Sequence, residues 1–273
     1  MSEGCYVYCV LHRGKKEEWG PIGLDRAPVF QIAQEGIACL VHRHELAPYQ
    51  GEDEQVKNWV VAHNQVVETA WKETGAVLPM TFNCIIQPLP GHSADEVVQA
   101  WLRKEGDRFQ AKLAYLEGKV ELGVQVIWTR KVLAANLLRQ NEELKEMTES
   151  MNGKPRGMTY FLQQKLEKAL AAKLLEKAEK DCRQQQKTLA GLAEEITSNK
   201  LKKLEGDRQM ILNLSLLARR DQVETIGETL DTFQEDGVEV RFTGPWPPYS
   251  FTTPADAPKQ APYEAAGEPP PLL

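Results

Sequence analysis

The sequence predicts an α+β protein with two α/β sandwich domains, the second of which carries a long helical hairpin. Three observations support this prediction. Short apolar strands and amphipathic helices alternate in both halves of the chain. A helical period runs from about Thr159 to Leu204, much further than in any other segment. The 273 residues, of which 42% are apolar, suffice for two globular cores.

The first domain, residues 1–118, is expected to form one sheet with helices packed on one face. Cys5–Leu11 is a continuous apolar run, typical of a strand buried on both sides. Asp53–Thr74 has an apolar stripe at helical spacing, and Ser93 with Glu96 forms a capping box that begins a second helix. The other predicted strands are Val29–Ala33, Ile37–His42 and Ala76–Ile86, the last with Pro79 inside it.

The second domain, residues 119–251, begins with the alternating strand Val120–Trp128. Its later predicted elements are a helix at Lys131–Glu149, the long helix at about residues 157–204, a strand at Met210–Leu216, a short helix capped by Asp221 and Glu224, and a last strand at Val238–Phe242. Residues 252–273 are rich in Pro, Ala, Gly and Glu, and are expected to be a disordered tail.

The long helix is the first candidate for a functional surface. About 45 helical residues at 1.5 Å each span roughly 65–70 Å, which exceeds the width of a small domain. Part of the helix should therefore project, and its apolar seam needs a partner. One interpretation is an antiparallel hairpin that closes on itself, another is a docking surface for a different protein, and a third is self-association. The candidate contact residues on this helix are Leu174, Leu189, Leu192 and Ile196.

A second candidate surface is Thr243–Phe251, which combines three prolines with a tryptophan, a tyrosine and a phenylalanine. Prolines hold a segment extended at low entropic cost, so its aromatic rings can be presented or packed readily. One interpretation is a strap that covers the sheet end of the second domain. The other is a partner-binding patch that includes Trp246 and Tyr249.

Charge and composition exclude several classes of protein. A net charge of −6 argues against a general nucleic-acid binder, which needs a basic footprint. No run of 18 apolar residues is present, so no membrane span is expected. The N-terminal residues lack the basic region of a secretory signal, and we expect a cytoplasmic protein. Five cysteines without ligand spacing are expected to be reduced and mostly buried.

No motif for catalysis, metal binding or cofactor binding stands out, and we expect a protein that is not an enzyme and holds no cofactor or metal. His63 lies in an apolar helical stripe and is interpreted as a core histidine. His42 and His44 end a strand without an evident third metal ligand. The alternative is a small-molecule or nucleotide-dependent enzyme on the same fold, with His42, His44 or His63 at its site.

Several short motifs, in order, resemble the gas vesicle protein GvpF/GvpL family. They are Tyr6-Val-Tyr8, His63 followed by Val66-Val67-Glu68, Leu78-Pro-Met80 with Phe82, Val120-Glu121 and Gly244-Pro-Trp-Pro-Pro-Tyr-Ser-Phe251. The last motif is the most specific. The family commonly has a basic residue and a glycine around the phenylalanine, where this chain has Thr81 and Asn83.

The resemblance implies two ferredoxin-like α/β domains with a coiled-coil element. It also implies a structural or assembly role in gas vesicles, the gas-filled buoyancy organelles of prokaryotes. Members of the family are minor components or assembly factors, thought to contact the small hydrophobic shell protein and other gas vesicle proteins. No catalytic residues come with the family.

Overall fold

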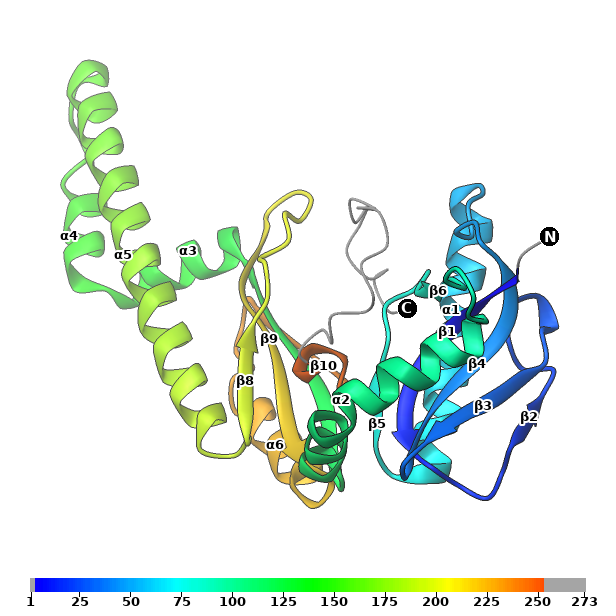
Figure 1. Ribbon diagram of the computed structural model, residues 1–273. Coiled ribbons are helices and arrows are strands. Elements are labelled where there is room, and N and C mark those ends of the chain that lie inside the picture. The colour runs from blue at the N-terminus through cyan, green and yellow to red at the C-terminus, as the bar shows by residue number, and fades with distance from the viewer. Residues whose placement is uncertain (1–2, 253–273) are drawn as a thin grey trace. The chain divides into compact units, whose positions relative to one another are not determined.

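The computed structural model describes residues 3–252, and its chain divides into two compact units. The first unit comprises Met1–Val120 together with the segment that begins at Trp246. The second unit comprises Glu121–Pro245. In both units, the strand pairs with a defined register are antiparallel. Each unit has its own sheet and is described here by itself (Figure 1).

The return of the chain at Trp246 differs from the expected second domain, which extended to residue 251. Pro247, Pro248 and Phe251 are buried, and the Tyr249 hydroxyl donates a hydrogen bond of 2.9 Å to Asn64 Oδ1 in the first unit. The proline-rich segment therefore packs on the first unit. The tail predicted at residues 252–273 lies, beyond Thr252, outside the described residues.

The first unit is built around its first strand. The sheet has the order β2-β3-β4-β1-β5, and β6 also pairs with β1. Its elements are β1 (Glu3–His12), β2 (Glu18–Gly20), β3 (Val29–Gln34), β4 (Ile37–Glu45), α1 (Asp53–Thr74), β5 (Val77–Pro79), β6 (Ile85–Ile86) and α2 (Ala94–Leu116). Residues Cys5 to Leu11 have no exposed surface, as the apolar run predicted.

The two helices of this unit cover opposite faces of the sheet, so the expectation that both lie on one face is wrong. Neighbouring strand residues point to opposite faces. Tyr6 bonds to His63 in α1, whereas Cys5 Sγ donates to Asp95 in α2. Because a helix covers each face of the sheet, β1 is buried on both sides. The capping box that was predicted at Ser93 and Glu96 is present at the start of α2.

The strand expected at Ala76–Ile86 is interrupted. β5 ends at Pro79, Met80 N still donates to Tyr8 O of β1 at 2.8 Å, and the chain then loops out before β6. Asn83 in this loop has φ = +68°. Its side chain is fixed by the backbone of Tyr49: Oδ1 accepts from Tyr49 N at 2.8 Å, and Nδ2 donates to Tyr49 O at 3.1 Å.

The second unit has a four-stranded sheet with the order β10-β7-β9-β8. Its elements are β7 (Lys119–Thr129), α3 (Arg130–Gln140), α4 (Glu142–Glu149), α5 (Arg156–Ala190), β8 (Glu195–Ser198), β9 (Arg208–Arg219), α6 (Val223–Asp231) and β10 (Val238–Trp246). The helix expected at Lys131–Glu149 is two helices, because Asn141 leaves the helical conformation and caps α4 through its side chain.

The long helix is shorter than predicted. It ends at Ala190, with Gly191 as its C-cap, and so spans about 52 Å at 1.5 Å per residue. The following Glu195–Ser198 segment forms β8, in which Ile196 pairs with Leu216 of β9. Branched Ile196 and Thr197 favour a strand, and tertiary pairing overrode the helical spacing of the apolar residues. Within residues 3–252, no helix is long and apolar enough to cross a membrane.

Candidate functional site

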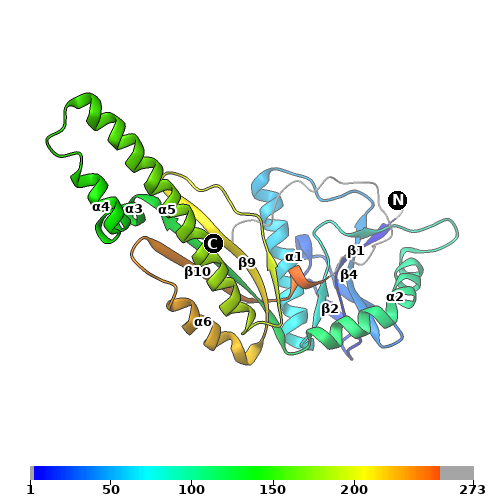
Figure 2. The ribbon, with the colours of Figure 1, turned by 90° about the vertical axis from the view of Figure 1, so that its left-hand side faces the viewer.

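Helix α5 offers the most exposed surface among the predicted contact elements. It lies wholly within the described residues, and only Gln185 and Leu189 of its 35 residues are buried. Its C-terminal half lies on the sheet, while its N-terminal half extends beyond the sheet with α4 beside it (Figures 1 and 2). The expectation that part of the helix projects is therefore met within this unit.

One side of α5 packs against its own hairpin. Half-buried positions recur at helical spacing and include Leu162, Leu166, Leu170 and Leu174. Helices α3 and α4 contact α5, Leu144 of α4 is fully buried, and Lys173 pairs with Glu143 at 3.5 Å. The interpretation of a hairpin that closes on itself accounts for this side of the helix.

The other side of the projecting half carries large apolar side chains in water. Met158 is 52% exposed, Phe161 58% and Leu175 62%, and Tyr160 is also exposed. The apolar spacing in the sequence did not indicate these residues, because they lie off the main apolar stripe. Their signal is weak in the sequence, since lysines separate Phe161 from Leu175.

The six predicted contact residues lie on several different elements. Leu189 is fully buried in the core of the second unit. Leu174 is half-buried on α5, Leu192 lies in the turn after it, and Ile196 is in β8 and not on the helix. Trp246 and Tyr249 are half-buried and belong to the first unit.

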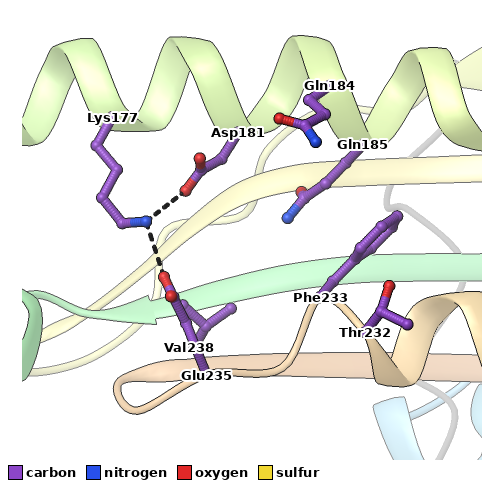
Figure 3. A pocket seen from close by; sticks show the side chains of 8 residues that line it. All are labelled: Lys177, Asp181, Gln184, Gln185, Thr232, Phe233, Glu235 and Val238. Atoms are coloured by element: carbon purple, nitrogen blue, oxygen red, sulfur yellow. Dashed lines mark ion pairs between the residues drawn. The ribbon is translucent and has the colours of Figure 1, made fainter.

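A shallow pocket lies where α5 meets the turn between α6 and β10 (Figure 3). Lys177 Nζ is 2.9 Å from Asp181 Oδ2 and 2.8 Å from Glu235 Oε1. Partial burial acts to lower the pKa of Lys177, but the hydrogen bonds to the two carboxylates outweigh it and raise that pKa. The positive charge of Lys177 is thus already balanced by the two carboxylates. The ion pair with Glu235 connects α5 to the α6–β10 turn.

The first unit gathers the histidines in a tyrosine–histidine cluster formed by Tyr6, Tyr8, His42, Tyr49 and His63. Tyr6 Oη and His63 Nδ1 are 2.9 Å apart, and Tyr8 Oη and His42 Nδ1 are 2.8 Å apart. His63 Nε2 lies 3.0 Å from the Met80 carbonyl oxygen, and His42 Nε2 lies 3.1 Å from Tyr49 Oη. Both imidazoles are therefore bonded at both nitrogens.

The hydrogen-bond pattern fixes the protons at His63. A carbonyl oxygen only accepts, so Nε2 carries the proton and Nδ1 accepts from the Tyr6 hydroxyl. Tyr6 Oη in turn accepts from the backbone N–H of Asn83 at 3.2 Å. Each polar atom in this series, from the Asn83 N–H through Tyr6 and His63 to the Met80 carbonyl, has a partner, as expected for a buried structural network.

Burial lowers the pKa of both His42 and His63 to about 4, and for His42 the neighbouring His44 and His63 act in the same direction. Both rings are thus neutral near pH 7. The interpretation of His63 as a satisfied core histidine agrees with its hydrogen bonds and burial. His44 stacks on Tyr49 with ring centroids 4.1 Å apart.

His42 and His63 are thus hydrogen-bonded groups in the core of the first unit. Within residues 3–252, no group of three or more His, Cys, Asp or Glu side chains is placed to hold a metal ion. Asn83 has φ = +68°, and asparagine tolerates this left-handed region better than most residues do.

Comparison with curated proteins finds gas vesicle proteins. The chain is 29% identical to gas vesicle protein L1 of Halobacterium salinarum over 92% of this chain and 91% of that protein. It is 28% identical to gas vesicle protein L of Haloferax mediterranei over 86% of this chain and 73% of that protein. Gas vesicle protein F of a Streptomyces species is 27% identical, over 90% and 98% of the two chains.

Solved structures with a similar fold include the gas vesicle protein GvpF from Anabaena sp. PCC7120, with a TM-score of 0.72 and 20% identity over 93% of this chain and all of that one. GvpF from Microcystis aeruginosa gives a TM-score of 0.63 at 18% identity, over 92% and 99% of the two chains. The model of the family "Gas vesicle synthesis protein GvpL/GvpF" matches residues 4–253. The chain therefore belongs to the GvpL/GvpF family of gas vesicle synthesis proteins.

Proposed function

We propose that this protein is a gas vesicle accessory protein, a minor structural component or assembly factor that binds the small hydrophobic shell protein and other gas vesicle proteins. It acts in the cytoplasm, at forming or finished vesicles, and transforms no substrate. The observation that carries the proposal is the exposed apolar side of α5, with Met158, Phe161 and Leu175, in a chain of this family.

The physical argument concerns exposed apolar surface. A small apolar shell subunit aggregates unless its surface is covered before it enters the wall. A projecting helix with large apolar side chains in water can provide that cover at little conformational cost, because its partner-facing side is already ordered. Among the predicted contact residues, Leu174, Leu192, Ile196, Trp246 and Tyr249 keep some exposed surface, and their contact with partners stays a prediction.

We also infer that the second unit is a ferredoxin-like domain. Its order of strand, helices, strand, strand, helix and strand, with the sheet order β10-β7-β9-β8, supports this assignment. In the first unit only strands and a three-residue 3-10 helix, Leu24–Arg26, separate β1 from β4, so the inference covers the second unit alone. Helices α3 to α5 then form a helical insertion between the first two strands of the second domain.

The proposal is tested in a host that forms gas vesicles. The gene is deleted, and a tagged full-length copy is supplied in its place. Deletion should reduce the number of vesicles, measured by flotation and electron microscopy, and the tagged protein should restore them and co-purify with the shell protein. Normal vesicles in the deletion strain would contradict the assembly role. Purification of the tagged chain without any other gas vesicle protein would contradict the binding role.

A further inference from the structure

A second row of side chains runs along the exposed side of α5. Its members follow one another at intervals of three, four, three, four and three residues, which is the spacing of core positions in a coiled coil. All six are exposed. This exposed row consists of Met158, Phe161, Lys165, Lys168, Ala172 and Leu175.

The exposed row is separate from the hairpin contact. At about 100° per residue, its centre lies about 130° around the helix from the half-buried stripe of Leu162, Leu166 and Leu170. Helices α3 and α4 occupy the stripe side and leave the row in water. The row therefore has the spacing of a helix-binding seam without a helix on it in this chain.

The two central lysines give the row a positive charge. The residues three and four positions away from Lys165 and Lys168 include no carboxylate, and the two ammonium groups lie three residues apart. Lys165 Nζ lies 4.8 Å from the centre of the Phe161 ring. Within the described residues neither lysine pairs with a carboxylate, whereas Lys173 and Lys177 on the same helix do.

A second copy of this chain fits the row poorly. Antiparallel pairing of two rows places Lys165 of one copy opposite Lys168 of the other, and parallel pairing places identical lysines together. With the two rows aligned over their whole length, either arrangement brings like charges into the seam, which is unfavourable. A carboxylate-bearing partner removes the repulsion between the two lysines and pairs with both.

We propose that the exposed row binds an amphipathic helix of another gas vesicle protein, in which two carboxylates at three- or four-residue spacing are flanked by apolar residues. The carboxylates face Lys165 and Lys168, while the apolar residues pack on Met158 and Phe161 at one end and Leu175 at the other. This inference rests on the proposed function and specifies the chemistry of the partner. An anionic membrane fits less well, because Glu176 and Glu179 continue the same side of the helix.

Photo-crosslinking identifies what covers the row. The full-length protein with benzoylphenylalanine in place of Phe161 is produced in cells that form gas vesicles and irradiated, and cross-linked peptides are sequenced by mass spectrometry. We expect a segment of another gas vesicle protein with two Asp or Glu residues at the stated spacing among apolar residues. A cross-link to a second copy, to lipid or to a segment without such carboxylates would overturn the inference, as would the absence of any cross-link.

Charge reversal tests the lysines directly. Lys165→Glu with Lys168→Glu should lower the recovery of the partner about tenfold or more, equivalent to at least about 1.4 kcal/mol. The matched control is Lys180→Glu with Lys187→Glu, which makes the same charge change on exposed positions of α5 outside the row. Circular dichroism checks that both variants keep their helix content.

Equal recovery by the two double variants would refute the pairing with Lys165 and Lys168. It would leave the proposed function intact, since that fails only if the unmodified chain recovers no gas vesicle protein or its deletion has no effect on vesicles. Recovery by the unmodified chain should also fall as salt is raised, because screening weakens exposed ion pairs.

Discussion

The Tyr6 hydroxyl donates a hydrogen bond of 2.9 Å to His63 Nδ1 and so joins β1 to α1 across 57 positions of the chain. Both side chains are buried, and His63 is held from its other nitrogen by the Met80 carbonyl. Strand, helix and the loop after β5 are thus connected through one imidazole ring. This relationship makes His63, one of the candidate catalytic residues in the sequence, part of the core of the first unit.

Removal of the Tyr6 hydroxyl should destabilise the protein. Tyr6→Phe keeps the ring but leaves His63 Nδ1 and the Asn83 N–H without their partner, at a cost of about 1–3 kcal/mol. Urea unfolding measures the change. Tyr160→Phe is the control, because Tyr160 is exposed and its free energy of unfolding should change by less than about 0.5 kcal/mol. Equal effects of the two substitutions would show that the network contributes nothing.

Stability should fall when the pH is lowered from about 6.5 towards 4. The folded state holds His42 and His63 neutral with pKa values of about 4, below the ordinary value of 6.5, so the unfolded chain binds more protons in this range. The stabilisation is complete above pH 6.5 and is lost as the pH approaches 4, at most by about 3 kcal/mol for each histidine.

Urea midpoints at several pH values between 7.5 and 5 measure this dependence. His63→Gln, which keeps a donor and an acceptor without a group that titrates in this range, should have a smaller loss of stability between pH 6.5 and 5 than the unmodified protein. An unchanged slope in this variant would mean that His63 does not titrate as its burial requires.

Two leucines of α5 should differ sharply in their effect on stability. Leu189 is fully buried and Leu175 is 62% exposed. Leu189→Ala should cost about 2–5 kcal/mol by leaving a cavity, and Leu175→Ala less than about 0.5 kcal/mol. Thermal or urea unfolding distinguishes them. A large loss from Leu175→Ala would mean that this side of the helix is packed within the chain and is not free for a partner.

Two substitutions of Asn83 distinguish the effect of its backbone conformation on stability from the effect of its side-chain hydrogen bonds. Asn83→Gly and Asn83→Ala both remove the two hydrogen bonds to the Tyr49 backbone, but only glycine adopts φ = +68° without strain. The glycine variant should therefore be more stable than the alanine variant by about 1–2 kcal/mol. Equal unfolding midpoints for the two variants would contradict the assigned backbone conformation.

Local patterns in the sequence were sufficient for much of the fold. The helix Asp53–Thr74 was predicted with its observed bounds, since its apolar stripe and Gly75 are both local signals. The capping box of α2 was likewise readable from Ser93 and Glu96. In contrast, Ile196 was assigned to a helix because its pairing with Leu216 depends on a strand elsewhere in the chain.

The contact surface was harder to predict than the fold. Spacing identified Leu174 and Leu189 as apolar positions of α5, but it could not say that Leu174 is half-buried and Leu189 fully buried within the chain. The exposed Phe161 and Leu175 become visible only once the packed side of the helix is known. The same holds for Trp246 and Tyr249, whose segment returns to the first unit through long-range packing.

The central claim is that the protein binds the small hydrophobic shell protein through the exposed side of α5. The most direct measurement is recovery of the shell protein by tagged full-length chains that carry Phe161→Ser and Leu175→Ser, compared with a Val61→Ser control on the exposed side of α1, where Val61 is 50% exposed. We predict that the double variant folds normally and loses most of the shell protein, while the control retains it. Equal recovery by the two variants would contradict the claim.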